Sequence, residues 1–265
     1  MRRIRRIKPG NTPTKPTNNG GITRIERGVR TSKVVKTNVA PTILPKNPQQ
    51  IDWNNRPSAA NWPYDTVKPL WLGETVYIIG GGPSLKGFQW ESLLGKRTIA
   101  INRAVQFWPK ADACYWTDSR VYQWYKRDID KFQGLKFTIR SGVPYEGTVY
   151  ILKKGQKYGL EAARDSLSHG NNSGYAAINL AVHLGASRIV LLGYDMGNDG
   201  KISHFHEGYP THATAEGIYK NEFIPGFKIL RELLYTKGIE CYNASINSKL
   251  DVFPKIDMIR ALSFS

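Results

Sequence analysis

The chain has few cysteines, no long apolar run and little acidic charge in its first fifty residues. Its two cysteines, Cys114 and Cys241, stand far apart in short apolar runs. This spacing makes neither a disulfide framework nor a metal-binding pattern, so we expect both to be buried and reduced. No segment approaches the ~18 apolar residues that a spanning helix needs, and no apolar segment follows the N-terminal arginines. We therefore expect a soluble, cytoplasmic protein without a membrane span.

Basic residues are concentrated near the N-terminus. Residues 1–50 hold twelve Lys or Arg against one acid, Glu26, and so supply +11 of the formal net charge of +17. Residues 1–60 are also rich in Pro, Asn, Thr and Gly, which predicts a basic, extended or disordered arm before a domain at 61–265. Such an arm suits contact with nucleic acid, with an acidic partner surface or with a large assembly such as a capsid, and equally suits a solubilising tail.

From about residue 70, apolar runs of strand length alternate with helix-length amphipathic segments. This pattern predicts an α/β, Rossmann-like domain with a mostly parallel sheet flanked by helices. The helices with the clearest limits run from Ser173 to Leu184 and from about Ala215 to Tyr235, each followed by a glycine. Strands are expected at Thr75–Ile79, Thr98–Ile101, Ala113–Thr117, Leu135–Ile139, Val149–Leu152, Arg188–Leu192 and Ile239–Tyr242.

Three consecutive glycines follow the first of these strands. Gly80, Gly81 and Gly82 lead into Pro83 and Ser84, where a helix is expected to begin. Glycines let the backbone approach a ligand, and the N–H groups of a first helical turn favour an anion, so the segment predicts a phosphate-binding turn. Neither the dinucleotide motif G-x-G-x-x-G nor a P-loop occurs in the chain. A tight turn with Ser84 as a simple helix cap is the alternative.

A second polar helix start lies at Asn172, Ser173 and Gly174. Asn172 or Ser173 can cap the helix, while Gly174 keeps the approach open to a second anionic or ribose contact. Two such helix starts beside strand ends are typical of the ligand crevice at the point where strand order reverses. Capping alone would also explain the residues.

Polar side chains follow three of the expected strands. Asp195, Asn102 and Asp118 are placed to contact a metal, a ribose or a substrate hydroxyl, although a turn residue at each position is the simpler alternative. His204 and His206 stand in a segment beyond Asp195 that is expected to overhang the crevice. Histidine suits proton transfer near neutral pH, which makes each a candidate base.

These motifs together resemble a known family. The runs Ile79–Leu85, Ala100–Arg103, 172–174 and Leu192–Asp195 resemble those of proteins similar to the archaeal 6-hydroxymethylpterin diphosphokinase, and more distantly the bacterial lipooligosaccharide sialyltransferases. The resemblance covers about residues 73–245 and excludes the arm. Proteins of this type also occur in bacteriophage genomes.

The two resemblances imply different chemistry. The sialyltransferase resemblance implies a nucleotide-sugar donor bound by Gly80–Ser84, Asn102 and Ser173 with Gly174, and His204 or His206 as base. Gly81 stands where that family has Asn, which removes one side-chain contact with the donor. The diphosphokinase resemblance implies ATP and Mg²⁺, with Asp195 and Asp118 near the metal.

We therefore expect a nucleotide-dependent group transferase of glycosyltransferase type, with His206, His204 or Asp195 as the base and an acceptor that the sequence does not identify. A Mg²⁺- and ATP-dependent diphosphokinase is the first alternative. A non-catalytic phage virion protein or DNA-associated protein, anchored by its basic arm, is the second. A phage-encoded protein would act in the host cytoplasm or in the virion.

Overall fold

The computed structural model describes residues 63–197, 204–206 and 216–264. The chain divides into two units, Met1–Leu44 and Pro45–Ser265, and every described residue belongs to the second. The expected arm lies outside the described residues, so its limits and its role stay predictions. Within the described residues no helix is both long and apolar enough to cross a membrane.

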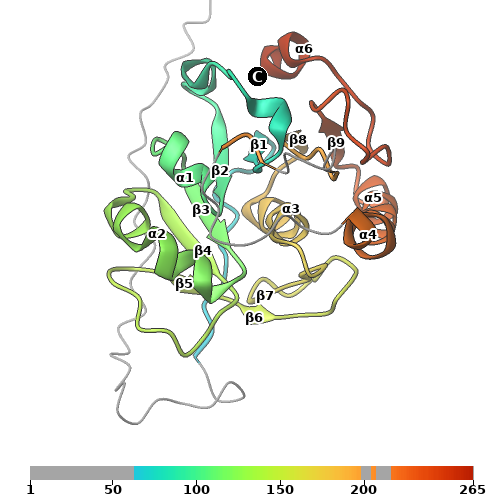
Figure 1. The fold of residues 1–265 in the computed structure, drawn as a ribbon. Coiled ribbons are helices and arrows are strands. Elements are labelled where there is room, and N and C mark those ends of the chain that lie inside the picture. The colour runs from blue at the N-terminus through green and yellow to red at the C-terminus, as the bar shows by residue number, and fades with distance from the viewer. Residues whose placement is uncertain (1–62, 198–203, 207–215, 265) are drawn as a thin grey trace, which may run out of the picture. The chain divides into compact units, whose positions relative to one another are not determined.

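Seven parallel strands form the central sheet in the order β5-β4-β3-β2-β1-β8-β9 (Figure 1). The predicted α/β, Rossmann-like fold is therefore confirmed. Strand order reverses at β1, which pairs with β2 on one side and β8 on the other. The strands are β1 Thr75–Ile79, β2 Arg97–Ile101, β3 Ala113–Trp116, β4 Leu135–Thr138, β5 Tyr150–Ile151, β8 Arg188–Leu192 and β9 Glu240–Asn243, and a separate pair holds β6 Lys153–Lys154 and β7 Ser166–Leu167.

Helices cover the sheet so completely that all five residues of β1 are buried. Tyr77 and Ile79 pack in one apolar cluster with residues of α1, α2 and α6, and strand alternation turns Val76 and Ile78 to the opposite face. The α-helices are α1 Ala104–Phe107, α2 Ser119–Lys131, α3 Ser173–Leu184, α4 Glu216–Ile218, α5 Ile224–Thr236 and α6 Met258–Ser263. Both cysteines are buried and free, as predicted.

Helix α3 has the limits that its sequence predicts. At its start, the Asn172 side chain accepts a hydrogen bond from the N–H of Tyr175 at 3.1 Å. At its end, Gly185 adopts the left-handed conformation, with φ of 103°, and closes the helix. Because α3 begins at the carboxyl edge of the sheet, its free N–H groups are directed to that edge.

The segment after the three glycines differs from the expectation. Instead of an α-helix, the three-residue 3₁₀ helix η3, Pro83–Leu85, follows Gly82, and the chain is extended again at Lys86. A second 3₁₀ helix, η4, spans Trp90–Leu93. A single 3₁₀ turn does not build up the aligned dipole of an α-helix, so the expectation that an α-helix begins at this turn is wrong, while anion binding by the turn stays a prediction.

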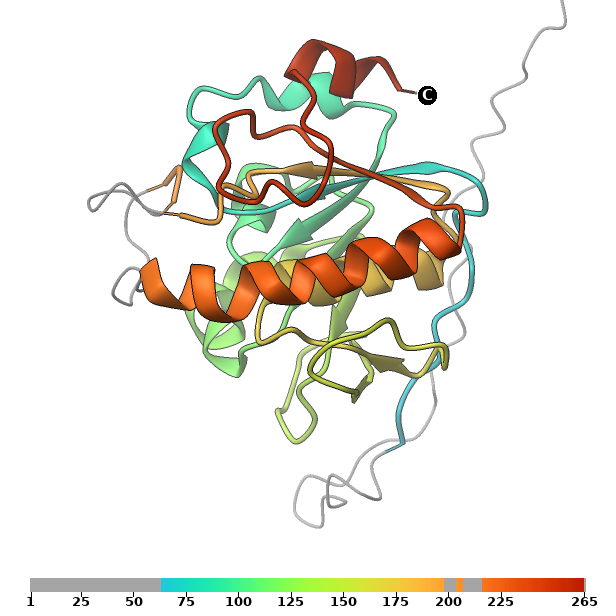
Figure 2. The same cartoon turned by 90° about the vertical axis from the view of Figure 1, so that its right-hand side faces the viewer.

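The expected long helix before β9 is interrupted by a wider turn. Between α4 and α5, residues Tyr219–Phe223 form the π-helical turn η5. Figure 2 shows α4, η5 and α5 as one continuous helical rod that begins close to the carboxyl edge of the sheet. Such turns occur often beside functional sites.

Candidate functional site

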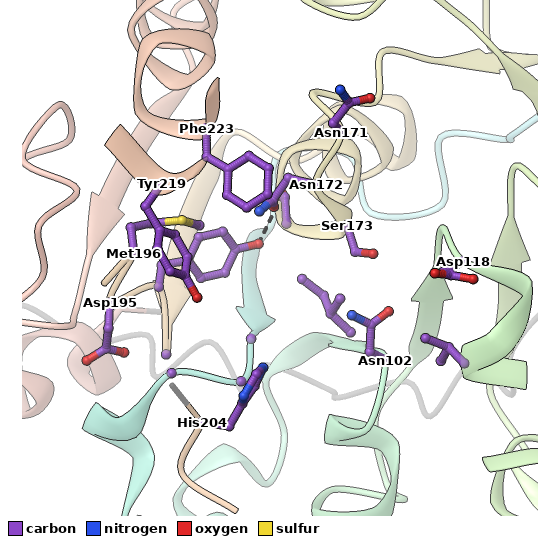
Figure 3. Close-up of a pocket in the computed structure, with 18 of the residues that line it drawn as sticks. Asn102, Asp118, Asn171, Asn172, Ser173, Asp195, Met196, His204, Tyr219 and Phe223 are labelled. Atoms are coloured by element: carbon purple, nitrogen blue, oxygen red, sulfur yellow. Dashed lines mark hydrogen bonds between the residues drawn. The ribbon is translucent and has the colours of Figure 1, made fainter. Parts of the chain in front are cut away.

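A cavity of about 320 Å³ opens at the carboxyl ends of β1, β2, β3 and β8, where the strand order reverses (Figure 3). Its position is the one expected for a ligand crevice in a doubly wound sheet. It is lined by residues 80–82, 101, 102, 118, 120, 121, 124, 171–174, 193–197, 204, 219 and 223.

Most of the predicted site residues meet around this one cavity. The structure brings together Gly80, Gly81, Gly82, Asn102, Asp118, Asn172, Ser173, Gly174, Asp195 and His204. Two predicted residues are not among those that line it. Ser84 lines a second cavity of about 460 Å³, which shares Asp195 and Gly197 with the first. His206 contacts Arg103 instead.

The glycine turn packs tightly against the end of β8. The N–H of Gly82 donates to the carbonyl of Gly193 at 2.8 Å. A Cβ atom on Gly80 would lie 2.7 Å from that same carbonyl oxygen, and one on Gly82 would lie 1.8 Å from Oδ2 of Asp195. Glycine is thus required at both positions by close packing as well as by any approach of a ligand.

Asp195 binds the turn directly. Its Oδ1 accepts a hydrogen bond from the N–H of Ser84 at 3.1 Å, and its Oδ2 accepts one from the Ser84 hydroxyl at 2.7 Å. The Ser84 hydroxyl also lies 2.9 Å from that of Ser245. Ser84 is therefore not a side-chain cap of η3. Through Asp195 and Ser245, Ser84 connects the glycine turn to the segments that follow β8 and β9.

Strained backbone gathers at the cavity. Among the described residues, three that are not glycine have positive φ: Asn102 at 53°, Asn171 at 51° and Met196 at 50°. All three line the cavity, and they come from three different connections of the fold. Left-handed conformations in such residues persist where the surrounding structure holds them, and they cluster at ligand sites.

Asn102 also carries an unusual polar group. Its Oδ1 is buried and has no hydrogen-bond partner within the part of the chain that the structure describes. Burying an unpaired acceptor costs about 1–3 kcal/mol, and at Asn102 this cost is combined with a left-handed backbone.

Ser173 is a second polar residue in the cavity wall. Asn172 caps α3 with its own side chain, so the Ser173 hydroxyl is not used to close the helix. Ser173 is half-buried in the first position of α3 and lines the cavity beside the helix N–H groups. A Cβ on the next residue, Gly174, would lie 2.7 Å from the Tyr194 ring, so this glycine is a packing requirement.

The wall formed by α2 is both aromatic and charged. Asp118 caps α2 by accepting from the N–H of Arg120 at 2.9 Å, and it also accepts from the Arg120 side chain. These hydrogen bonds lower the pKa of Asp118 below its usual 3.8. The Arg120 guanidinium lies over the Trp124 ring at 5.5 Å. None of this wall except Asp118 was expected from the sequence.

His204 stands over the glycine turn. A Cβ atom on Gly81 would lie 2.9 Å from Cδ2 of His204, so the imidazole fills the space above residue 81. Burial, and then the positive charge of Arg103, lower the pKa of His204 below its usual 6.5. Both effects favour the uncharged form of the ring.

The two carboxylates expected to bind Mg²⁺ are already engaged. Both oxygens of Asp118 accept from Arg120, and both oxygens of Asp195 accept from Ser84. Figure 3 shows the two side chains at opposite ends of the cavity. Across the described residues no group of three or more His, Cys, Asp or Glu side chains is arranged to hold a metal. Asp118 and Asp195 therefore line the same cavity but do not form a metal-binding group with each other in the described residues.

Several cavity residues were missed by the sequence analysis. Tyr219 and Phe223 come from η5, and Asn171 and Met196 from strained connections. The sequence offers a signal only for Asn171, which lies within the polar run before α3. Tyr219, Phe223 and Met196 reach the cavity through the packing of segments distant in the sequence, which leaves no local pattern.

Comparison with protein-family models gives no match, and comparison with curated proteins gives none either. Among solved structures, the chain is similar to the sialyltransferase CstII from Campylobacter jejuni in complex with a substrate analogue, cytidine-5'-monophosphate. The identity is 18%, the TM-score is 0.44, and the alignment covers 70% of this chain and 85% of that one. This distant likeness concerns the fold.

Proposed function

We propose that the protein is a nucleotide-dependent group transferase of glycosyltransferase type, with its donor in the 320 Å³ cavity. The observation that carries the proposal is the buried, unpartnered Oδ1 of Asn102 on a strained residue at the strand-order reversal. A binding site retains such a costly group where a ligand supplies the missing hydrogen bond.

The cavity walls suit the two ends of a nucleotide. Ile101, Val121 and Trp124 form an apolar and aromatic side that can pack against a nucleobase. Asn102, next to them, offers its oxygen to an N–H or O–H of the nucleoside. On the other side, Ser173 and the N-terminus of the twelve-residue α3 favour a phosphate.

His204 is the base in this proposal. The acceptor hydroxyl attacks the anomeric carbon of the donor sugar, and the sugar's bond to the nucleotide phosphate breaks with its electron pair on the phosphate oxygen. The uncharged imidazole of His204 takes the proton that the hydroxyl loses. The second cavity, which shares Asp195 and Gly197 with the first, is the place we assign to the acceptor.

Calorimetric titration with CMP, UMP, AMP and ATP, each with and without magnesium, tests the proposal. We expect a pyrimidine or purine monophosphate to bind without magnesium. Binding of ATP only with magnesium would favour the diphosphokinase alternative. No binding of any nucleotide would contradict the proposal and favour the non-catalytic alternative.

Two matched serines locate the ligand. Ser173 is the first residue of α3 and lines the cavity, whereas Ser119 is the first residue of α2 and is not among the lining residues. Ser173→Ala is expected to weaken nucleotide binding by about tenfold, the value of one hydrogen bond of ~1.4 kcal/mol. Ser119→Ala is expected to leave it unchanged. Equal effects of the two variants would place the nucleotide elsewhere.

A further inference from the structure

The segment that carries His204 is fastened to the glycine turn by its middle residue. The N–H of Phe205 donates to the carbonyl of Gly81 at 2.9 Å. The Phe205 ring packs against Phe107 at 4.7 Å and against Trp90 at 5.7 Å between ring centroids. This attachment directs His204 towards the cavity and leaves His206 outside it, beside α1.

His206 is fixed by α1 and by the residue that precedes it. Its ring stacks on Phe107, with centroids 5.4 Å apart and planes at 15°. Nη1 of Arg103 lies 3.0 Å from His206 Nδ1. A guanidinium can only donate, so Nδ1 accepts and the His206 ring carries its proton on Nε2.

Arg103 is itself held in place. Its Nε donates to Oε1 of Gln106 at 2.7 Å. Its guanidinium carbon lies 5.6 Å from the centre of the Phe107 ring and 5.7 Å from that of Tyr125. The Gln106 amide in turn donates to Asp128 on α2. Arg103 is thus anchored to two helices and offers a fixed donor to His206.

The contact continues from His206 to His204. The two imidazole centroids lie 5.3 Å apart with planes at 28°, and His204 covers Gly81 on its other side. We propose that Arg103 is a positioning residue for His204, acting through His206, which it holds as a neutral platform for the His204 ring. A role of Arg103 in catalysis rests on the proposed function, whereas its positioning of the His204 ring does not.

Electrostatics support this arrangement. Among the described residues, the charged and titratable groups around His204 are Arg103 and His206, Tyr219 from η5, Asp195 from the end of β8, and Asp118 with Arg120 from the start of α2. The last two neutralise each other in an ion pair, and Asp195 is engaged by Ser84. Beyond burial, Arg103 is the group that lowers the pKa of His204. The same residue therefore orients the ring and keeps it uncharged.

NMR titration of the full-length protein with ¹³C-labelled histidine tests this without any substrate. His204→Gln identifies the His204 signal. In Arg103→Gln we expect the His204 titration midpoint to rise, because a nearby positive charge is lost, and its high-pH chemical shift to change, because His206 is released. In Arg103→Lys the charge stays, so the midpoint stays low while the chemical shift changes. Arg127→Gln on the exposed side of α2 is the control and should change neither.

His206→Phe separates positioning from charge. It retains an aromatic ring for Phe107 but removes the acceptor for Arg103, so we expect the His204 chemical shift to move with Arg103 still present. An unchanged His204 signal in both Arg103→Lys and His206→Phe would overturn the proposal. If nucleotides fail to bind but these shifts occur, the positioning stands and the proposed function fails. If nucleotides bind and the shifts are absent, the proposed function stands and the positioning role of Arg103 fails.

Discussion

Oδ2 of Asp195 occupies the space in which a Cβ atom on residue 82 would have to lie, at a distance of 1.8 Å. The same oxygen accepts a hydrogen bond from the Ser84 hydroxyl. The carboxylate at the end of β8 thus fits over a bare backbone at the end of β1 and secures the residue two positions later. The Asp195 carboxylate can take this position only because residue 82 has no side chain.

Gly82→Ala should therefore be costly. The backbone of Gly82, with φ of −68° and ψ of 152°, is one that alanine adopts readily, so the cost is steric. We expect a loss of about 1–3 kcal/mol of stability, measured by urea denaturation. Gly81→Ala is the comparison, because its Cβ meets the edge of the His204 ring at 2.9 Å and not a carboxylate and backbone. A Gly82→Ala variant as stable as Gly81→Ala would refute the steric account.

Asn102 lets binding be separated from stability. Glycine adopts a φ of 53° without strain, and Asn102→Gly also removes a buried, unpaired oxygen. We expect this variant to melt at the same or a higher temperature while it loses about tenfold or more in nucleotide affinity. Asn102→Ala keeps the strain and should be less stable than Asn102→Gly. Full nucleotide affinity in Asn102→Gly would remove Asn102 from the binding site.

The two residues at the start of α3 should behave in opposite ways. Asn172 accepts the capping hydrogen bond, so Asn172→Ala is expected to cost about 1 kcal/mol of stability. Ser173→Ala should leave the melting temperature nearly unchanged, because Ser173 does not cap the helix. Thermal denaturation without a ligand distinguishes them. A larger loss from Ser173→Ala would mean that the cap has been assigned to the wrong side chain.

Acid should destabilise the fold through buried histidines. His183 is buried against Ser166, whose carbonyl lies 2.9 Å from Nε2, and burial lowers the pKa of His183 below 6.5. The pKa values of His169 and His204 are lowered as well. A folded-state pKa below the unfolded value means that stability is complete above pH 6.5 and is lost as pH falls through the folded-state values.

His183→Gln isolates one of these groups. The glutamine amide can still donate to Ser166 but does not titrate. We expect the drop in urea midpoint between about pH 7.5 and about pH 5.5 to be smaller than in the unmodified protein. An unchanged drop would show that His183 does not titrate in this interval.

The basic arm predicts a separate, salt-dependent activity. Residues 1–50 supply +11 of the net charge, so their removal should abolish weak binding to double-stranded DNA while nucleotide binding is retained. Fluorescence anisotropy at rising salt measures this, because electrostatic binding weakens steeply with salt. DNA binding that survives the deletion would contradict an anchoring role for the arm.

Local sequence signals predicted much of the fold. Continuous apolar runs located β1 and β8 at their observed limits, and Asn172 with Gly185 located both ends of α3. The 3₁₀ turn after Gly82 escaped prediction because Asp195, 111 residues further along the chain, holds it through Ser84. Contacts of this range leave no periodic trace in the sequence.

The candidate site was predicted in outline. Polar residues within three positions of the carboxyl ends of parallel strands are brought to one edge of the sheet, so Asn102, Asp118 and Asp195 could be expected there. The positive φ of Asn102 and the placement of His204, but not His206, in the cavity wall could not, because both depend on packing from other elements.

The π turn gives the last long helix a change of phase. In a regular α-helix, eight residues rotate through about 800°, which would leave Tyr219 about 80° away from Phe227 around the axis. The wider turn at Tyr219–Phe223 takes up most of that difference. Tyr219 and Phe227 can therefore lie on the same face of the helix. Phe227 is buried against the core, and Tyr219, two turns earlier, lines the cavity. With one residue fewer, a regular α-helix would span the same interval in about 700° and keep both residues on one side, so the π turn accommodates one extra residue without turning Tyr219 away from the cavity.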